Sequence, residues 1–474
     1  MTRPDIIIQE RHRDEIQAIL STPDGVEGAA YLLLGRSEIA QDPWDKNART
    51  RYTSFEVIGI PPEEQISASD QHVTWSTQSF VRLCRRAQEE GLVPAIVHSH
   101  PSGFDGFSDQ DRRNERDLFT LARNRNGEKT RLVSIVQVGA GTYRAQVWKD
   151  DKTPEECRQV SCIGSNIAIQ STYDEKANEV LSRQALAFGD EVNSRLQHLR
   201  VAVVGCGGTG SPVVHLLARL GIGRIVAIDD DFVEYSNLNR LYGATQQDAD
   251  EHAPKVDVMV RVVSEMGLGT EIRSVKGWVD SPQARDALRS CDVIFGCTDD
   301  HSGRAFLNRL SHFYLIPVID VGLVLMPGES GKAGLQEMAA RVSVLFPSAP
   351  CLICRGNINL EAARSEDLRR RNPSEYERQK REAYVIGAGN PAPAVVTFTT
   401  EAATMAVNEL VQGLVDFRGD GKWAWQRYRK LDSGVERTPS LSADPDCPIC
   451  SEQVNRNWGR GDVVPFLDRV GSVS

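Results

Sequence analysis

The hydrophobic and polar positions divide the chain into two stretches with different rhythms. Up to about residue 150, amphipathic helical patterns alternate irregularly with short apolar runs. The helical patterns are His12–Leu20, Ser76–Gly91 and Asp109–Ala122, and the strand-like runs are Ala30–Leu34, Glu56–Ile60, Pro94–Val97 and Arg131–Val138. Helices and strands mixed in this way predict an α/β domain over residues 1–150.

A more regular alternation begins at Leu181 and predicts a second α/β domain over residues 181–474, built on a doubly wound, Rossmann-like parallel sheet. The alternating segments are Arg200–Val204, Gly210–Leu220, Arg224–Asp229, Lys255–Met266, Val293–Gly296, Ser302–Phe313 and Val318–Val321. Residues 151–180 are polar and are interpreted as a connector. The charged run Glu361–Arg381 has no apolar stripe, which favours an exposed helix or a mobile insertion over a binding site.

Composition narrows the class of protein. The 474 residues include 55 basic and 65 acidic side chains, a formal charge of −10, which gives no general reason to bind nucleic acid or an anionic membrane. No secretory signal and no apolar stretch of about 18 residues or more is present, so a cytoplasmic protein is expected. In that compartment, paired cysteines are typically metal ligands or catalysts.

Two histidines lie at the end of a predicted strand in the first domain. His98 and His100 are two residues apart, so both side chains leave the same face of the strand. Pro101 follows, and then Ser108 and Asp111, where Ser108 can cap the next helix. Two imidazoles and one carboxylate form a common catalytic zinc site with its fourth position left for water.

This arrangement, H-x-H-P-x6-S-x-x-D, resembles the JAMM (MPN-plus) metalloproteases over about residues 10–150. The resemblance implies that an upstream glutamate acts as general base and that Ser108 stabilises the oxyanion. Glu27, just before an apolar run that ends in glycine, fits the base best, with Glu38 and Glu56 as rivals. The family hydrolyses amide bonds after the C-terminal glycine of ubiquitin-like proteins.

A glycine-rich turn in the second domain predicts a nucleotide site. Gly205, Gly207 and Gly210 satisfy G-x-G-x-x-G between a strand and a helix, and Asp229 ends the next strand. These features alone are typical of an NAD-linked oxidoreductase. Three additions favour a triphosphate instead: the run Asp229–Arg240, Lys255 at a helix start, and Gly296–Asp300 after an apolar strand.

The assembly resembles the ThiF/MoeB branch of the ubiquitin-activating enzymes, from about Ser182 to Cys450. The resemblance implies adenylation of a C-terminal carboxylate with MgATP, and a homodimer in which the partner supplies an arginine that Arg183 matches. Asp231, close to Asp229 in the sequence, is also expected to contact the nucleotide. The full set matched or added is Gly205, Gly207, Gly208, Gly210, Asp229, Asp231, Asn237, Arg240, Lys255, Asp299 and Arg183. Within it, Arg240, Lys255 and Asp299 are the expected catalytic residues.

Four of the ten cysteines form two C-x-x-C pairs, which predict a closed structural zinc site. The ligands would be Cys351, Cys354, Cys447 and Cys450. A redox-active pair is the alternative. The interval between the pairs is long for a zinc ribbon, but it matches the place where ThiF/MoeB proteins fix their C-terminal region.

Some activating enzymes pass the acyl group to a cysteine between the first zinc pair and the final core helix. No cysteine occurs from Arg355 to Asp446, and the expected place lies near Arg381–Gly387. The adenylate would then pass directly to an acceptor, or another cysteine would serve. Cys157 and Cys162 are the least implausible substitutes, while Cys206, Cys291 and Cys297 are expected to be core residues.

The two resemblances together predict a bifunctional enzyme of a prokaryotic ubiquitin-like or sulfur-carrier pathway. Its cofactors would be ATP, Mg²⁺ and two zinc ions, one catalytic and one structural. Its partners would be a ubiquitin-like or sulfur-carrier protein, and a conjugating enzyme or a sulfurtransferase. The alternatives are a scaffold that binds a ubiquitin-like protein without turnover and, less favoured, the NAD-linked oxidoreductase.

Overall fold

The computed structural model describes residues 3–22, 25–68, 73–101, 103–139, 141–171, 179–327, 335–381, 394–451 and 458–463. The chain forms two compact units. Unit 1 contains Met1–Tyr173, Phe313–Leu315 and Asn457–Pro465, and unit 2 contains the rest. Within the described part of the chain, no helix is both long and apolar enough to cross a bilayer.

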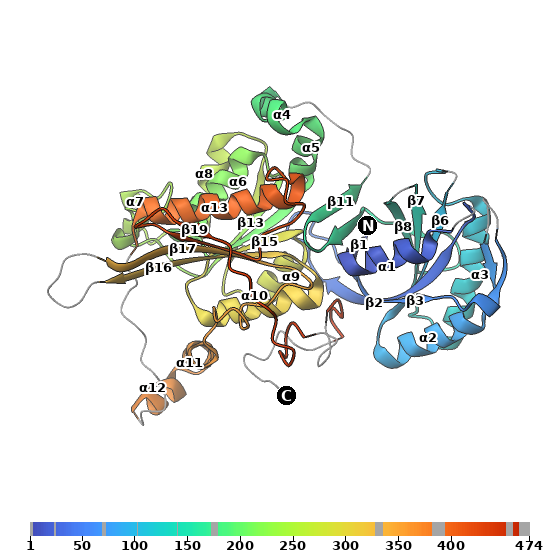
Figure 1. Ribbon diagram of the computed structural model, residues 1–474. Coiled ribbons are helices and arrows are strands. Elements are labelled where there is room, and N and C mark those ends of the chain that lie inside the picture. The colour runs from blue at the N-terminus through green and yellow to red at the C-terminus, as the bar shows by residue number, and fades with distance from the viewer. Residues whose placement is uncertain are drawn as a thin grey trace. The chain divides into compact units, whose positions relative to one another are not determined.

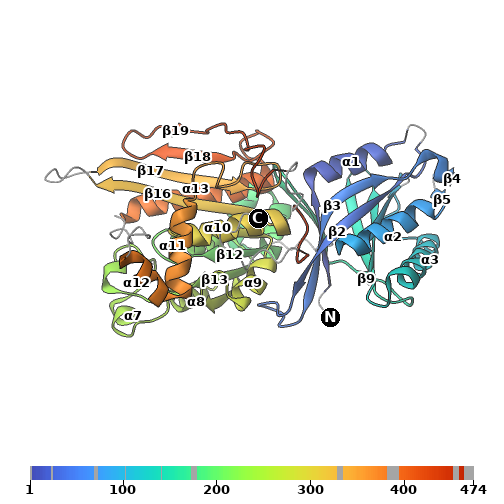
Figure 2. The same ribbon diagram turned by 90° about the horizontal axis from the view of Figure 1, so that it is seen from below.

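Unit 1 is a mixed sheet between helices (Figures 1 and 2). Its strands occur in the order β11-β10-β1-β3-β2-β6-β7-β8-β9. The strands are β1 (Asp5–Gln9), β2 (Ala29–Ile39), β3 (Arg49–Gly59), β6 (Val93–His100), β7 (Leu132–Val138), β8 (Thr142–Trp148), β9 (Glu155–Glu156), β10 (Gln159–Ile163) and β11 (Ile167–Ser171). A separate small sheet contains β4 (Gln65–Ala68) and β5 (Val73–Trp75), and a short 3₁₀ turn, η1, covers Pro62–Glu64.

Helices cover both faces of this sheet, which defines two apolar cores. Helix α1 (Glu10–Leu20) buries Ile16 and Leu20 on one face. Helices α2 (Gln78–Glu90) and α3 (Asp109–Asn126) bury Phe80 and Phe119 on the other. The predicted mixed α/β architecture of the first domain is therefore confirmed.

Residues 151–180, expected as a connector, contain β9, β10 and β11. Strand β10 pairs in parallel with β1, residue for residue from Asp5 opposite Gln159 to Gln9 opposite Ile163. Most of this stretch is therefore part of the sheet of unit 1. The pairing was not visible in the local pattern because the two strands are far apart in the chain.

Unit 2 is built on an eight-stranded sheet in the order β14-β13-β12-β15-β16-β17-β18-β19. The first five strands pair in parallel and the last three antiparallel. The strands are β12 (Arg200–Val204), β13 (Arg224–Asp229), β14 (Glu271–Lys276), β15 (Val293–Gly296), β16 (Val318–Pro327), β17 (Leu335–Leu345), β18 (Gln426–Lys430) and β19 (Glu436–Arg437). The predicted doubly wound sheet is confirmed.

Helices α6, α8 and α13 lie on one side of this sheet, and α9 and α10 on the other (Figures 1 and 2). The helices of unit 2 are α4 (Ser182–Phe188), α5 (Asp190–His198), α6 (Gly210–Leu220), α7 (Gln246–Asp250), α8 (Lys255–Met266), α9 (Pro282–Arg289), α10 (His301–Tyr314, whose last residues belong to unit 1), α11 (Leu360–Arg371), α12 (Pro373–Arg381) and α13 (Val396–Val415). Two 3₁₀ turns, η2 (Glu179–Leu181) and η3 (Tyr235–Asn237), complete the list.

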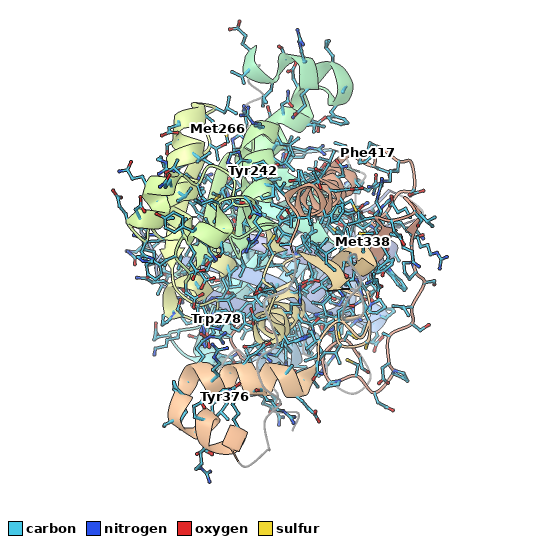
Figure 3. The ribbon with its side chains drawn as sticks, turned by 90° about the vertical axis from the view of Figure 1, so that its left-hand side faces the viewer. Tyr242, Met266, Trp278, Met338, Tyr376 and Phe417 are labelled. Atoms are coloured by element: carbon cyan, nitrogen blue, oxygen red, sulfur yellow. The ribbon has the colours of Figure 1, made fainter. Side chains whose placement is uncertain are left out.

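The charged run Glu361–Arg381 forms most of α11 and α12, and it is more firmly attached than its polarity suggests. Arg370 lies over the ring of Trp278, 3.2 Å from the ring centroid. Glu366 accepts a hydrogen bond of 2.8 Å from the amide of Ser302. Figure 3 labels Trp278 close to α11 and Tyr376 on α12, and Tyr376 is buried. These contacts attach α11 to other parts of unit 2.

Candidate functional sites

The side chains of the first candidate site come from one strand end and one helix start. His98 and His100 leave the same face of β6, as the two-residue spacing predicts. Ser108 caps α3, and Asp111 is in its first turn. The hydroxyl of Ser108 accepts the amide hydrogen of Asp111 at 3.1 Å, and the Asp111 carboxylate accepts the amide hydrogen of Ser108 at 2.7 Å. This capping box fixes the direction of the carboxylate.

Three ligand atoms come together in this site. Nε2 of His98 and Nε2 of His100 are 3.2 Å apart. The Asp111 carboxylate oxygens lie 3.4 Å from His98 and 3.3 Å from His100. In a tetrahedral zinc site with bonds of about 2.0–2.1 Å, ligand atoms are about 3.3 Å apart. The three residues therefore fit a metal ion with one position left over.

Neighbouring groups orient the side chains of His98, His100 and Asp111, here called the metal-ligand trio. Nδ1 of His100 donates to the carbonyl oxygen of Phe104 at 3.2 Å, which fixes the ring with Nε2 directed toward His98 and Asp111. Burial alone would raise the pKa of the Asp111 carboxyl. The hydrogen bonds from His100 and His98 override burial and hold that pKa well below its usual range. Asp111 is therefore an anion, as a metal ligand must be.

Glu27 lies beside the trio, and its rivals are engaged with other groups. Glu27 is buried, with Oε1 3.7 Å from Nε2 of His100. The next residue is held to β6 on both sides, because the Gly28 amide donates to the Ser99 hydroxyl at 3.0 Å and the Ser99 amide donates to the Gly28 carbonyl at 3.1 Å. Glu38 is exposed and accepts a hydrogen bond from Thr50.

Glu56, the second rival, is held by a two-bond ion pair with Arg86, at 2.8 and 2.6 Å. This ion pair holds the Glu56 carboxylate against Arg86 on α2. Of the three candidate bases, the structure gives only Glu27 a contact with the described metal-ligand side chains.

A second buried carboxyl lies one helical turn behind Asp111. Glu115 is 2% exposed and accepts hydrogen bonds from Nε2 of Gln146 at 2.6 Å and Nε1 of Trp148 at 2.7 Å. Burial raises its pKa to about 7 despite these donors. Sequence reasoning missed this residue, because a glutamate in a charged helix gives no signal of burial.

The raised pKa of Glu115 predicts a pH-dependent effect of Glu115→Gln. Because the folded protein disfavours the charged carboxyl, ionisation opposes folding increasingly as pH rises from about 4.5 to about 7. Glutamine removes this penalty and keeps an oxygen for Trp148. We expect the variant to be more stable than the parent at pH 8, by an upper limit of about 3 kcal/mol, and little changed at pH 5. Calorimetric unfolding at both pH values tests this, and equal effects at the two would contradict it. The exposed Glu89→Gln is the control.

The second candidate site lies at the carboxyl ends of the parallel strands of unit 2. Strand β12 pairs in parallel with β13 on one side and β15 on the other, so the order in which strands are added to the sheet reverses at β12. Ligands bind at such switch points in open α/β sheets. The glycine turn and Asp299 lie in the loops after β12 and β15, and Asp229–Asp231 lie at the end of β13 and just after it.

The glycine turn depends on close backbone approach. Gly205 has a φ of +84°, and a Cβ atom there would come 2.8 Å from the carbonyl oxygen of Cys297. A Cβ atom on Gly210 would come 1.7 Å from the carbonyl oxygen of Gly205. Nothing lies within 4 Å of a Cβ atom built on Gly207, where the turn is open. The turn leads into the N-terminus of α6, which favours an anion.

Acidic and basic groups meet beside this turn. Asp229 accepts hydrogen bonds from the amides of Cys206 at 2.5 Å and Asp231 at 2.8 Å. Nζ of Lys255 lies 2.7 Å from the Asp231 carboxylate. Burial would lower the pKa of Lys255, but the charges of Asp229, Asp231 and Asp299 raise it above its ordinary value. Lys255 is therefore a fixed cation among three acids.

The remaining predicted nucleotide residues are placed as follows. Asn237 ends η3, and its side chain accepts the amide hydrogen of Glu234 at 3.1 Å. The side chain of Arg240 lies against Gly208 of the glycine turn. A Cβ atom built on Gly208 would be 3.2 Å from Cδ of Arg240. Arg183 is exposed on α4, and among the described residues it is not brought into contact with this turn.

Sequence reasoning missed one residue that supports the Asp299 loop. Arg304, on α10, donates to the carbonyl oxygen of Asp299 at 3.4 Å and to the Asp320 carboxylate at 3.1 Å. Asp320 is buried on β16 and also accepts from Arg341 at 3.3 Å. The only sequence signal was an arginine one turn into a helix, which is too common to single out.

The four cysteines of the two C-x-x-C pairs form one cluster. Sγ of Cys351 is 3.9 Å from that of Cys354 and 3.7 Å from that of Cys447. Sγ of Cys354 is 3.5 Å from that of Cys450. Tetrahedral zinc with bonds of about 2.3 Å places sulfur atoms about 3.8 Å apart. The cluster fits a structural zinc ion, and no disulfide joins these sulfurs.

The other thiols are poorly suited to a thioester. Burial raises the pKa of Cys206, Cys297 and Cys157 well above the ordinary value, and that of Cys162 to about 12. Cys291 is buried. The place where the relay cysteine was expected, Arg381–Gly387, lies outside the described residues except for Arg381 itself.

One unit therefore carries a glycine turn among acidic and basic side chains together with a cysteine cluster, and the other carries the trio of His98, His100 and Asp111. The chain belongs to the ThiF family, whose model matches residues 181–449. Residues 9–149 match a second model, described as prokaryotic homologs of the JAB domain. Both predicted resemblances are confirmed.

Individual relatives resemble part of the chain. A SAMP-activating enzyme E1 of Haloferax volcanii is 27% identical over 284 residues, which cover 60% of this chain and 90% of the relative. The sulfur carrier protein ThiS adenylyltransferase of Escherichia coli is 29% identical over 135 residues, and the chain spans about half (53%) of its length. Among solved structures, E. coli MccB with ATP is 18% identical with a TM-score of 0.43, covering 59% of this chain and 76% of that chain.

Proposed function

We propose that unit 2 adenylates the C-terminal glycine of a ubiquitin-like or sulfur-carrier protein with MgATP. The observation that carries this proposal is the position of Lys255, a cation held among Asp229, Asp231 and Asp299 beside the glycine turn. A nicotinamide site has no need of this set, whereas a triphosphate and its magnesium ion do. Membership of the ThiF family and the names of the relatives support the same reaction.

In this reaction a carboxylate oxygen of the terminal glycine attacks the α-phosphorus of ATP. A new oxygen–phosphorus bond forms, the bond from the α-phosphorus to the bridging oxygen breaks, and pyrophosphate leaves with that electron pair. Lys255 and Arg240 offset the charge on the phosphates, and Asp229 holds the ribose. Asp299 would hold the magnesium ion, which supplies further charge stabilisation. Arg304 keeps the Asp299 loop in place.

We propose that unit 1 hydrolyses the amide bond after the same glycine. His98, His100 and Asp111 would hold zinc, which when bound supplies an activated water and polarises the scissile carbonyl. Glu27 receives the water proton and delivers it to the leaving amine. The Ser108 hydroxyl accepts the Asp111 amide, so its own proton can be donated to the developing oxyanion. The bond cleaved is a precursor extension or an isopeptide link.

The acyl-adenylate is proposed to pass directly to its acceptor, because burial raises the pKa of most of the thiols outside the cysteine cluster. The acceptor would be held by a conjugating enzyme or a sulfurtransferase. A homodimer is proposed because Arg183 and the apolar Leu186 are both exposed on α4, Leu186 to 89%. Two activities in one chain raise the local concentration of the shared partner.

The deciding experiment is isotope exchange between ATP and pyrophosphate in the presence of a small protein that ends in Gly-Gly. We expect exchange that requires this protein and is lost when its last glycine is removed. Cleavage of the same protein carrying a C-terminal extension tests unit 1. Binding without exchange or cleavage would identify a scaffold instead, and bound nicotinamide detected by mass spectrometry would favour the oxidoreductase.

The two metal sites give a separate prediction. Purified protein is expected to contain two zinc ions per chain by elemental mass spectrometry. Cys351→Ser breaks the four-sulfur cluster and should leave one zinc ion and a less stable unit 2, because binding of structural zinc contributes directly to folding. Cys157→Ser changes a thiol outside both clusters and should leave two. A Cys351→Ser protein that still binds two zinc ions would contradict the assignment.

A further inference from the structure

A short segment near the end of the chain is built into unit 1. Trp458–Val463, here called the tail segment, follows the ThiF unit in sequence but belongs to unit 1. It lies against β2, β3 and the end of α2. Trp458 is 4% exposed, and the guanidinium of Arg11 on α1 lies 5.7 Å from its ring centroid.

Main-chain hydrogen bonds hold the tail segment to the sheet. Gly461 forms a parallel bridge with Arg36 on β2, and the Asp462 amide donates to the Arg36 carbonyl at 2.8 Å. The amide of Glu38 donates to the Asp462 carboxylate at 2.6 Å. The Thr53 hydroxyl on β3 donates to the Gly459 carbonyl at 2.7 Å. The Glu38 amide therefore depends on Asp462 for its acceptor.

The close packing between the tail segment and β2 requires glycine in both of them. A Cβ atom on Gly35 would come 2.0 Å from the carbonyl oxygen of Gly459. A Cβ atom on Gly459 would come 2.4 Å from the carbonyl oxygen of Ser54, and one on Gly461 would come 2.3 Å from that of Arg36. Backbone atoms cannot yield as a flexible side chain does. The two surfaces are therefore complementary at the level of the main chain.

Side chains secure the end of the segment. Arg460 lies over the ring of Phe55, 5.0 Å from its centroid, and forms an ion pair with Glu90 at 3.2 Å. Val463 packs against the apolar core that contains Tyr31 and Leu33 of β2. An incidental surface contact would not contribute to a domain core.

From these contacts we infer that the tail segment is an integral part of unit 1, so that the JAB-like unit is completed only when the ThiF unit has been synthesised. Strand β2 begins two residues after Glu27 and pairs with β6 at His98. The tail segment braces the other end of that strand, at Gly35–Glu38. Its absence should loosen β2, and the position of Glu27 with it. The two units therefore mature together, although the JAB match ends at residue 149.

Two truncations of the full chain test this inference by hydrogen exchange. A chain ending at Arg456 lacks the tail segment, and a chain ending at Pro465 keeps it. We expect the Glu38 amide to exchange at least about tenfold faster in the shorter chain and unchanged in the longer one, because only the shorter one lacks its acceptor. A peptide of residues 457–465 should restore protection. Equal protection in both chains would overturn the inference, and neither result depends on enzymatic activity.

Glycine substitutions cover the case in which the shorter chain fails to fold. Gly461→Ala and Gly139→Ala both place alanine at positive φ, +61° and +56°, but only Gly461 has backbone within 4 Å of the new atom. Gly461→Ala should expose the Glu38 amide, whereas Gly139→Ala should not. If both variants leave Glu38 equally protected, the close packing is not required and the inference fails.

Discussion

Lys255→Met is expected to lower the rate of ATP–pyrophosphate exchange by about 10²–10³-fold while leaving hydrolysis by unit 1 unchanged. Lys255 is the cation that the charges of Asp229, Asp231 and Asp299 hold beside the glycine turn. Methionine keeps most of the side-chain volume and removes the charge, so Arg240 would be the one remaining cation of the proposed pair that offsets the phosphate charge beside the three acids. Initial rates of exchange, measured with saturating ubiquitin-like protein, give the effect directly.

A second lysine provides the control for this variant. Lys430, at the end of β18, is exposed. Lys430→Met should exchange pyrophosphate at the parent rate. Thermal unfolding should show that Lys255→Met is folded. A folded variant with more than a tenth of the parent rate would remove Lys255 from the proposed chemistry.

The metal-ligand trio could be predicted because each of its parts is a local feature. A strand places residues two apart on one face, which gives His98 and His100. A serine followed three residues later by an acid marks a helix start, which gives Asp111 its direction. The structure places these side chains within 3.4 Å of one another, although no long-range contact had been used to predict them.

The nucleotide site was predictable for a different reason. In a parallel sheet, all strands end at the same edge, so residues that follow successive strands are neighbours whatever their separation in the chain. Asp229 and Asp299 could therefore be placed beside the glycine turn once β12, β13 and β15 had been recognised. Arg183 lies on α4, before the first strand of the sheet, so the rule for residues that follow parallel strands does not predict its position.

Buried charge concealed part of the fold. The pattern predicted a strand over Glu56–Ile60, but β3 begins at Arg49. Its first half contains Arg49 and Arg51, whose side chains are almost fully buried because they pair with Asp5 of β1 at 3.1 and 3.8 Å. A hydrophobicity pattern counts such arginines as surface residues. Only the partner, more than forty positions away, shows that they are interior.

The tail segment could not have been predicted from the sequence. It is short, rich in glycine and charge, and follows the last cysteine pair, which are typical properties of an exposed terminus. Its ordered position depends on Gly35 and Thr53, which lie some four hundred residues earlier. Contacts of this range leave no local pattern, so the boundary of a domain can be wrong even where its family is recognised.

Glu27→Gln is expected to lower cleavage of a C-terminally extended ubiquitin-like protein by about 10²–10⁴-fold, with ATP–pyrophosphate exchange unchanged. Glutamine matches the shape of glutamate but cannot take up a proton. The site would keep His98, His100 and Asp111, so the zinc content should stay at two ions per chain. His98→Ala should instead lose both cleavage and the catalytic zinc ion. The difference separates a base from a ligand.

The two other candidate bases, Glu38 and Glu56, provide matched controls for this prediction. Glu56→Gln removes a carboxylate that is already paired with Arg86, and Glu38→Gln changes one that accepts from Thr50. Both variants should cleave at close to the parent rate, since neither carboxylate contacts the trio in the described structure. Glu27 differs from them in its burial and in its 3.7 Å approach to His100. If Glu27→Gln retains activity while either rival loses it, the base has been misassigned. If all three cleave normally, the metal-bound chemistry needs no carboxylate from this group, and Glu27 serves only to complete the buried site.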